Sequence, residues 1–349
     1  MRAARSLPLR FVLAAGLPAL LAACPGPGST PAAPAPIASP PVAAGPSRIE
    51  THSFHAAHLG VDKDYVVYLP AGYDADPARR WPVVYLLHGL FGDETSWTEK
   101  GNLAATADRL GLAAIVVMPD GDNSFYVNSV SPGDLQACLR DGSHLLDPGV
   151  DRTRSCVQTA DYEDYIVSDL IGHVEATWRA LPERRGRGIG GFSMGGYGAL
   201  VLGLRHPDVF AAVASHSGVD APLYAGPHPY QAGKVELVTD VKTAFQGAGP
   251  LAVWIRGIFG TDRAYWLARD PATLAAALMP GAMALYLDCG TEDGFSLHDG
   301  MQYLHDILTT RGIEHTYYLG PGRHDFSFWS ERVDDSLAFF AATFAAAGG

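Results

Sequence analysis

Hydrophobic positions after residue 48 follow two alternating patterns. Short, almost continuously apolar runs are typical of β-strands covered on both faces, and they occur at residues 65–69, 83–87, 113–118, 211–215 and 284–287. Between these runs, apolar residues recur at the spacing of helices with one buried face, in segments 161–181, 195–205, 300–311 and 330–344. This alternation predicts an α/β fold with a doubly wound, mostly parallel sheet.

Two segments depart from the alternation. Residues 123–159 are rich in loop-forming residues, and residues 219–254 show a mixed pattern. Long irregular insertions in a compact α/β domain often form lids or pocket walls over an active site. An insertion can also be a surface elaboration, and the pattern leaves both interpretations open.

The first 24 residues have the pattern of a signal peptide. Three arginines precede a short apolar stretch at residues 11–23, which is too short to favour a transmembrane helix. The stretch ends in Leu-Ala-Ala-Cys, which resembles a bacterial lipobox, so we expect an exported lipoprotein anchored in the cell envelope through lipidated Cys24. Each buried methylene of such an anchor contributes about 0.8 kcal/mol. Pro25, where Asp would favour inner-membrane retention, indicates the outer membrane or its periplasmic face. Simple secretion after cleavage near Ala23 is the alternative.

Residues 25–47 are rich in Pro, Ala, Gly and Ser and carry no periodic apolar pattern. Such a segment cannot bury a core and predicts a semi-extended spacer. Residues 48–349 are then long enough for a single large catalytic domain.

Composition limits the possible partners and cofactors. The net charge of −12 and the lack of a Lys/Arg cluster argue against nucleic acid, since binding phosphates requires a basic surface. No HExxH motif or CxxC pair is present, so we expect no zinc site. In an oxidising compartment, Cys138 and Cys156 could form a disulfide across a polar loop, and Cys289 would stay free at a strand end.

The pentapeptide Gly-Phe-Ser-Met-Gly at residues 191–195 is the strongest candidate for chemistry. A strand-like segment at 187–190 precedes it and a glycine-rich apolar helix follows. A nucleophile elbow requires this context, because small residues two positions before and after the serine permit the sharp turn. We therefore predict Ser193 as a nucleophile at a helix N-terminus, whose dipole favours negative charge.

A nucleophilic serine requires a base and an acid, which follow it in that fold in the order serine, acid, histidine. His324 follows a strand-like run at 315–319 and is the predicted base. Asp288, Glu292 and Asp293 all follow or end the preceding strand. Asp288 is still on the strand, so we favour Asp293 as the acid, with Glu292 as the alternative.

Two backbone N–H groups should stabilise the negative charge that develops in the reaction. One is the N–H of Met194, which follows the nucleophile. The other should come from the glycine-containing loop at residues 88–92, with Leu90 as first choice and Phe91 as second.

Several aromatic residues lie near these motifs and could line a substrate pocket or pack in the core. We predict that Phe91, Trp97, Tyr126 and Trp329 contact the substrate; Phe125 and Phe295 are further aromatic residues near the same loops.

Taken together, the motifs resemble an esterase family of α/β-hydrolases. That family includes esterase D (S-formylglutathione hydrolase), tributyrin and feruloyl esterases and the antigen 85 mycolyltransferases. The matching stretches lie in the family's order at residues 65–74, 85–97, 116–126, 161–175, 188–200, 259–271, 286–295 and 320–329. The resemblance implies an α/β-hydrolase fold with Ser193, Asp293 and His324 as triad and Leu90 and Met194 as oxyanion donors. It also implies a carboxylic ester as substrate, with no metal or cofactor.

The resemblance leaves the reaction partly open. We expect a serine esterase that hydrolyses small or aromatic acyl esters through an acyl-enzyme. One alternative is acyl transfer to a sugar or lipid hydroxyl, and another is a non-catalytic binding protein on a hydrolase scaffold. The loop at residues 128–160 is longer than in simpler members, and export does not suit the role of a cytosolic glutathione-conjugate hydrolase.

Overall fold

A computed structural model describes residues 45–130, 135–141, 152, 156, 161–242 and 250–348. The predicted signal peptide, Cys24 and nearly all of the spacer lie outside these residues. No helix within the described ranges is long and apolar enough to cross a membrane.

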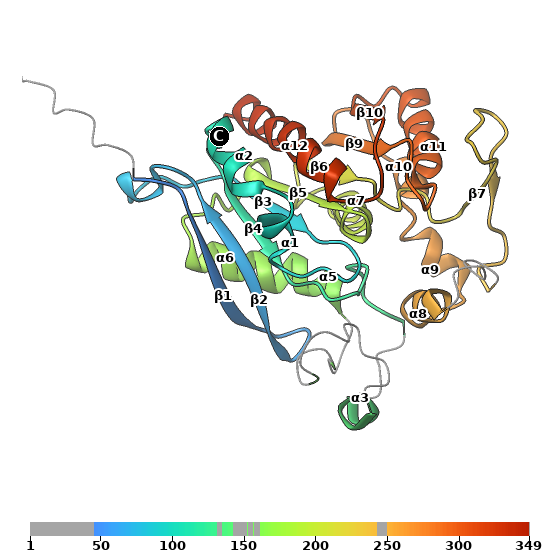
Figure 1. Cartoon of the computed structure of the whole chain (residues 1–349), viewed down its shortest axis with the longest axis horizontal. Helices are drawn as coiled ribbons and strands as arrows, with labels where there is room; N and C mark the ends of the chain where they lie inside the picture. Colours follow the sequence, from blue (N-terminus) through green and yellow to red (C-terminus); the bar gives the residue numbers. More distant parts are fainter. Residues whose placement is uncertain are drawn as a thin grey trace, which may run out of the picture. The chain divides into compact units, whose positions relative to one another are not determined.

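An eight-stranded sheet forms the centre of the fold (Figure 1), in the spatial order β1-β2-β4-β3-β5-β6-β9-β10. The six strands from β4 to β10 pair in parallel, whereas β1 and β2 form an antiparallel hairpin that pairs antiparallel with β4. The strand bounds are β1(Arg48–Ala56), β2(Val61–Leu69), β3(Val83–Leu87), β4(Ile115–Pro119), β5(Arg187–Phe192), β6(Ala212–His216), β9(Ala284–Gly290) and β10(Thr316–Gly320). A separate small pair consists of β7(Tyr224–Gly226) and β8(Glu236–Leu237). The predicted α/β fold with a mostly parallel sheet is confirmed.

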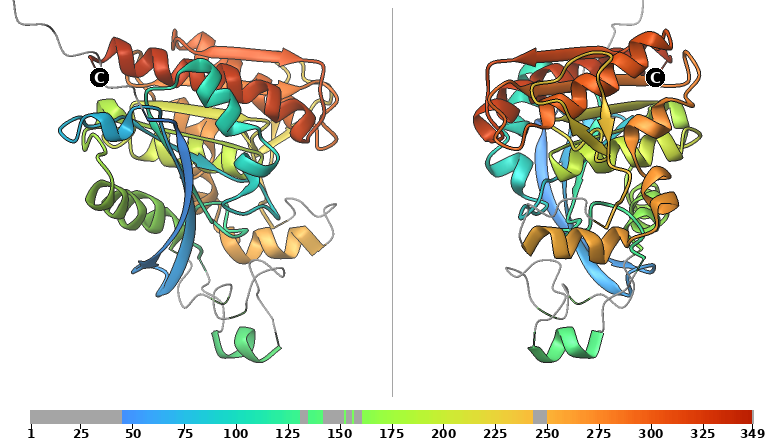
Figure 2. Two further views of the ribbon diagram at one scale, coloured as in Figure 1. Left: turned by 60° about the vertical axis from the view of Figure 1, so that its left-hand side comes forward. Right: turned by 90° about the vertical axis from the view of Figure 1, so that its right-hand side faces the viewer.

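Helices cover both faces of this sheet (Figure 2). One face packs against α1(Ser96–Glu99), α2(Leu103–Leu110) and α12(Phe326–Ala346). The other packs against α5(Tyr162–Asp164), η2(Tyr165–Leu170), α6(Ile171–Thr177), α7(Met194–Arg205), α8(Pro250–Phe259), α9(Arg263–Leu267), α10(Pro271–Ala275) and α11(Leu297–Thr310). Short 3₁₀ turns lie at η1(Tyr73–Ala75) and η3(Arg184–Gly186).

Strand β3 shows why the core strands are apolar throughout. Val83, Tyr85 and Leu87 belong to the core on the α7 side, and Val84 and Leu86 belong to the core on the α12 side. Because successive side chains point to opposite faces, a strand covered on both sides needs apolar residues at every position.

The predicted helix at residues 161–181 ends earlier than the sequence pattern suggests. The helical stretch, which contains the π-helical η2, stops at Thr177, and Trp178 is extended with φ −110° and ψ 160°. Trp178 leaves the helix to pack its ring against His52 on β1 and to donate its indole N–H to the Tyr65 hydroxyl. Strand β1 and helix α2 were not predicted at all.

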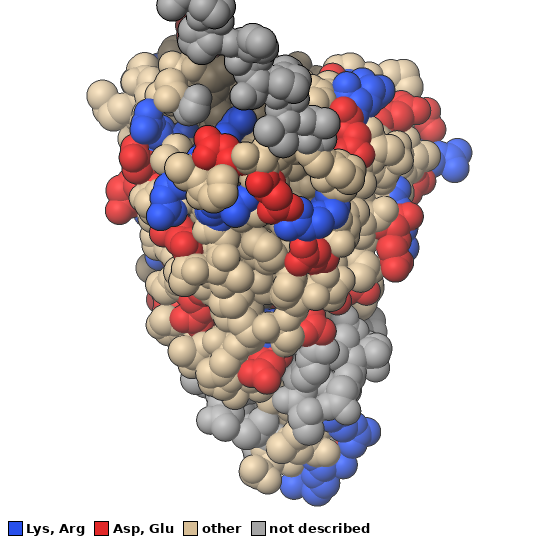
Figure 3. All heavy atoms as spheres, turned by 90° about the vertical axis from the view of Figure 1, so that its left-hand side faces the viewer, with Lys and Arg blue, Asp and Glu red and all other residues tan. Residues whose placement is uncertain are grey.

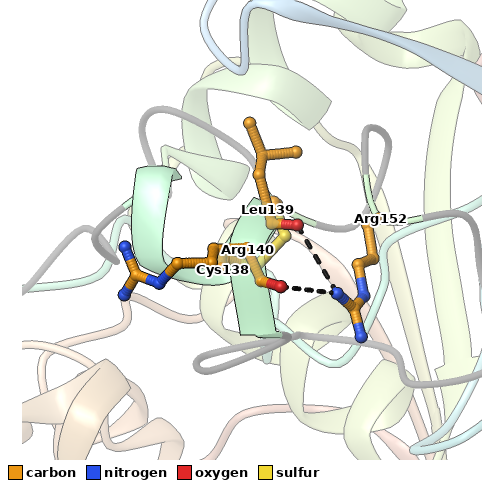
Figure 4. Close-up of a disulfide and its surroundings, with 5 residues drawn as sticks. Cys138, Leu139, Arg140 and Arg152 are labelled. Atoms are coloured by element: carbon orange, nitrogen blue, oxygen red, sulfur yellow. Dashed lines mark hydrogen bonds between the residues drawn. A yellow bond between two sulfur atoms is a disulfide. The ribbon is translucent and has the colours of Figure 1, made fainter.

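The described part of the loop-rich insertion includes helix α3(Leu135–Asp141) and a disulfide between Cys138 and Cys156 (Figure 4). The guanidinium of Arg152 donates hydrogen bonds to the carbonyls of Leu139 and Arg140, at 3.5 Å and 3.1 Å. The disulfide links two residues that are 18 positions apart, and the Arg152 hydrogen bonds add to this link. A crosslink over such a loop stabilises a fold by about 3 kcal/mol, largely by restricting the unfolded chain.

Charged side chains of both signs are interspersed across the face shown in Figure 3. Ion pairs such as Arg48–Asp74 and Arg187–Glu175 bring opposite charges together at 2.5 Å. The more exposed pair, Arg48–Asp74, adds little stability. The described residues on the face in Figure 3 form no broad area of a single charge sign.

Candidate active site

Ser193 lies at the sharp turn between β5 and α7. Its backbone has φ 55° and ψ −119°, a strained conformation for a residue with a side chain. A Cβ atom on Gly195 would lie 2.4 Å from the carbonyl oxygen of Leu87, and one on Gly191 would lie 2.5 Å from Gly195. Only glycine therefore fits at these two positions, which explains the spacing of the motif.

His324 is the partner of this serine hydroxyl. It lies between β10 and α12, and its Nε2 is 2.8 Å from Ser193 Oγ. The next residue, Asp325, caps α12 by accepting a hydrogen bond from Ser327 N at 2.9 Å. The cap fixes the start of α12 and so holds the short loop that carries the imidazole.

Asp293 completes a chain of three side chains. Its Oδ2 lies 2.7 Å from His324 Nδ1, and its Oδ1 accepts the N–H of Phe295 at 2.8 Å. Because a carboxylate can only accept, His324 carries its proton on Nδ1 and offers Nε2 to the serine hydroxyl. Burial alone would raise the pKa of Asp293, but the hydrogen bond and charge of His324 outweigh burial, and the net pKa is lowered.

The other two carboxylates considered from sequence point elsewhere. Glu292 is largely exposed and lies 3.5 Å from Arg323. Asp288 is fully buried on β9 and bonds to His216 Nδ1 at 2.7 Å. Of the three, only Asp293 contacts His324.

Leu90 and Met194, the candidate oxyanion donors, line the same pocket as Ser193. The N–H of Met194 is the first of α7 and has no intrahelical acceptor. In the loop at residues 88–92, the N–H of Phe91 is already donated to Asn123 Oδ1 at 2.7 Å. Among the described residues no acceptor contacts the N–H of Leu90 or of Met194, so these two donors are available to a substrate.

The loop at residues 88–92 is held from below by the segment that follows β4. Gly121 N donates to His88 Nε2 at 2.9 Å, and the Tyr126 hydroxyl donates to the His88 carbonyl at 3.0 Å. With the Asn123 bond to Phe91, three contacts anchor this loop. Asn123 was not identified from sequence, because its role depends on β3 and β4 being neighbours in the sheet.

The anchoring segment is itself fixed by a buried cation. Lys63, fully buried on β2, bonds to Asp120 at 2.5 Å and to Asp122 at 2.8 Å. A buried charge is tolerated only when it is paired and hydrogen-bonded, as here. The Lys63 pair therefore fixes the start of the loop that supports Leu90.

Ser193 opens into a pocket of about 770 Å³ with mostly apolar walls. Phe91 and Trp329 line it, as predicted, and so does Phe295. The prediction for Trp97 and Tyr126 is wrong: both are buried beneath the loop, where Trp97 donates to the Leu87 carbonyl at 3.1 Å. The pocket walls missed from sequence come from α7, α8 and α9, namely Tyr197, Ile255, Phe259 and Trp266.

A second serine–histidine–aspartate chain lies under the first. His216 Nε2 is 2.9 Å from Ser336 Oγ, and His216 Nδ1 is 2.7 Å from Asp288 Oδ2. All three residues are fully buried. The His216 carbonyl accepts the N–H of Ser193 at 2.9 Å, so this buried array adjoins the elbow.

The described residues contain no group of three or more His, Cys, Asp or Glu side chains arranged to hold a metal ion.

Comparison with known proteins places this fold and site in a class. A family model described as "Putative esterase" matches residues 56–340. Esterase Rv1288 of Mycobacterium tuberculosis is 30% identical over 172 residues, which are 49% of this chain and 32% of that protein. The diacylglycerol acyltransferase/mycolyltransferase Ag85A of Mycobacterium leprae is 26% identical over 277 residues, 73% of each chain. An S-formylglutathione hydrolase structure from Agrobacterium tumefaciens matches with a TM-score of 0.63 at 21% identity, covering 85% of this chain and 96% of that one.

The sheet order, the helices on both faces and the elbow after β5 define an α/β-hydrolase. The family match covers most of the chain, and the chain belongs to the esterase family of these hydrolases. Its match spans about a third of the length of the mycobacterial esterase.

Proposed function

We propose that the protein is a serine carboxylic-ester hydrolase with Ser193 as nucleophile. One observation carries the proposal: an elbow serine bonded to His324, and through it to Asp293, opens into an apolar pocket beside two unpaired N–H groups. Each component has a separate role in acyl transfer to water.

The reaction proceeds in two halves. Ser193 Oγ attacks the ester carbonyl carbon while His324 Nε2 takes the hydroxyl proton, and the N–H groups of Leu90 and Met194 stabilise the oxyanion. His324 then gives this proton to the departing alcohol, leaving an acyl-enzyme. Water, deprotonated by His324, attacks the acyl carbon. The bond to Ser193 Oγ then breaks, the carboxylic acid is released, and His324 returns the proton to Ser193 Oγ. Asp293 keeps the imidazole in the required tautomer and stabilises its charged form.

A burst experiment tests the proposal. With a p-nitrophenyl ester, the native protein should release up to one equivalent of p-nitrophenol per chain before steady turnover, provided that deacylation is the slower step. Ser193→Ala should abolish both the burst and the turnover. Turnover by Ser193→Ala at the native rate would contradict the proposal.

Acyl transfer is a second candidate, because a relative that matches most of the chain is named as an acyltransferase/mycolyltransferase. The two reactions share the acyl-enzyme and differ in the acceptor. Hydrolysis releases free acid in equal amount to p-nitrophenol. If adding a sugar diverts most of the acyl group into a new ester, transfer is the reaction.

We also propose export and lipid anchoring through Cys24. The sequence of residues 1–24 supports this, as does the Cys138–Cys156 disulfide, since disulfides persist in oxidising compartments. In a bacterial host fed with labelled palmitate, the native chain should carry label in the membrane fraction, and Cys24→Ser should not. An unlabelled native chain would contradict lipidation.

A further inference from the structure

Two groups of aromatic side chains line the pocket that contains Ser193 and His324. The first, which we call the inner wall, consists of Phe125, Tyr197, Phe259 and Trp266. Phe259 is central to it, with ring centroids 5.6 Å from Phe125 and 4.8 Å from Trp266. All four side chains are at least 95% buried in the fold, yet each faces the pocket.

The second wall, which we call the histidine-side wall, consists of Phe295, Phe326 and Trp329. The rings of Phe295 and Trp329 each lie 4.9 Å from the imidazole of His324, edge to face. Phe295 is 69% exposed and so forms the mouth of the pocket. The two walls differ in depth: the inner wall is deep and the histidine-side wall reaches the surface.

The proton path determines which part of an ester meets which wall. His324 Nε2 must give its proton to the oxygen of the leaving alcohol, so that oxygen lies within hydrogen-bond reach of the imidazole. The carbonyl oxygen points to Leu90 and Met194. The acyl chain therefore extends away from both the imidazole and these two N–H groups. Phe125 N lies 3.4 Å from Met194 Sδ, so the inner wall adjoins the residue that follows the nucleophile, whereas the histidine-side wall adjoins the imidazole that protonates the alcohol.

Both side-chain hydrogen-bond donors of the inner wall are already used within the fold. The Tyr197 hydroxyl donates to the Arg269 carbonyl at 2.8 Å, and the Trp266 indole N–H donates to the Gly260 carbonyl at 3.1 Å. A hydroxyl on an acyl group placed there would lose its water without gaining a partner, which is unfavourable.

We propose that the inner wall is an acyl-binding site that selects large, purely apolar acyl groups, either medium-length alkyl chains or unsubstituted aromatic rings. The proposal rests on the esterase function proposed above. An acetyl group would leave most of the 770 Å³ pocket unfilled, and each methylene added to the acyl group should raise kcat/KM up to about fourfold while it becomes buried. The histidine-side wall contacts the alcohol.

Two ester series test this assignment. In the first, p-nitrophenol is constant and the acyl group is acetyl, butyryl, octanoyl, cinnamoyl or 4-hydroxycinnamoyl. The native chain should prefer octanoate to acetate by about tenfold or more in kcat/KM, and cinnamate to 4-hydroxycinnamate by about tenfold. In the second series, the acyl group is constant and the alcohol is methyl, phenyl or naphthyl.

Matched variants separate the walls. Phe259→Leu should lower the octanoate-to-acetate ratio and leave the alcohol ratios as they are. Phe295→Ala should change the alcohol ratios and lower all rates of the acyl series by one common factor. Because Phe259 is buried, Trp266→Phe provides a second inner-wall variant, and the melting temperature of each variant shows whether it is folded.

A flat acyl series in the native chain, equal rates for cinnamate and 4-hydroxycinnamate, or an effect of Phe259→Leu on the alcohol series alone would overturn the assignment. Failure of the esterase proposal would look different. In that case Ser193→Ala would hydrolyse the esters of both series as fast as the native protein does.

Discussion

The molecule contains two serine–histidine–aspartate chains with nearly the same geometry. In the first, His324 lies 2.8 Å from Ser193 and 2.7 Å from Asp293. In the second, His216 lies 2.9 Å from Ser336 and 2.7 Å from Asp288. The first opens into a pocket, whereas the second has no exposed surface at all.

The difference shows that three hydrogen-bonded side chains do not make a catalytic site. Ser193 sits on a strained turn beside two available N–H donors, whereas Ser336 lies in the middle of α12 and donates its hydroxyl to the Val333 carbonyl at 3.2 Å. The buried array has instead a structural position. It joins β6, β9 and α12 beneath the elbow, and its carboxylate also accepts the Tyr286 hydroxyl at 2.8 Å.

Replacing each of the two serines with alanine tests the difference between the two arrays most directly. Ser193→Ala should lower kcat for a p-nitrophenyl ester by about 10⁴-fold or more, because no nucleophile remains. Ser336→Ala should leave kcat within a few-fold of native and reduce the free energy of unfolding by about 1–3 kcal/mol, because His216 Nε2 loses its buried partner. Steady-state rates and urea unfolding of the same preparations check both. Comparable losses of kcat in the two variants would contradict the assignment.

Replacing the carboxylate that contacts His324 should give the next largest effect. Asp293→Asn should reduce kcat by about 10³- to 10⁴-fold, because an amide no longer stabilises the required tautomer and the charged imidazole. Glu292→Gln is the matched control, and its rate should stay near native since Glu292 faces Arg323. A large loss in Glu292→Gln with little loss in Asp293→Asn would reverse the assignment of the acid.

Asn123 holds the loop that carries Leu90, the proposed oxyanion donor. The buried array has no corresponding donor loop among the described residues. Asn123→Ala should reduce kcat about 10- to 100-fold with a smaller effect on KM, because the loop carrying Leu90 loses one of its three anchors. Asn123→Asp retains an oxygen acceptor and should recover part of the rate. Equal losses in the two variants would show that the contact to Phe91 N is unimportant.

A separate effect, on stability and not on rate, concerns pH and the carboxyl of Asp220 beside the buried array. Burial raises the pKa of Asp220 from 3.8 to about 7, while Ser215 donates a hydrogen bond to it at 2.7 Å. Between these pH values the folded chain keeps a proton that the unfolded chain has lost. Stability from this group therefore falls as pH rises from about 4 to about 7, by at most about 4 kcal/mol.

Asp220→Asn stays neutral and should lose this pH dependence. Relative to the native chain, its urea midpoint should rise between pH 5 and pH 8. A constant difference between the two chains over that range would show that the Asp220 pKa is not raised.

The sequence predicted the sheet, and it predicted Ser193 with its partners, because those signals are local. Apolar runs indicate covered strands, and glycines around Ser193 indicate an elbow whatever the rest of the chain does. Strand β1 escaped prediction because its burial alternates along an edge.

The rest depends on which strands are neighbours. Trp97 and Tyr126 follow motif loops in sequence but turn beneath them, so proximity along the chain misplaced both in the pocket. Ile255 and Phe259 lie far in sequence from Ser193, Asp293 and His324, and helix α8 brings them to the wall of the pocket. The buried array joins residues up to 120 positions apart and has no sequence motif.

Labelling with a fluorophosphonate probe, followed by peptide mapping, tests the central claim most directly. The claim is that Ser193 is an activated nucleophile and that Ser336, in the buried serine–histidine–aspartate array, is not. The native protein should carry one label per chain, on the peptide that contains Ser193, and none on the peptide that contains Ser336. Ser193→Ala should take up no label. An unlabelled native chain, or equal labelling of native and Ser193→Ala chains, would contradict the account.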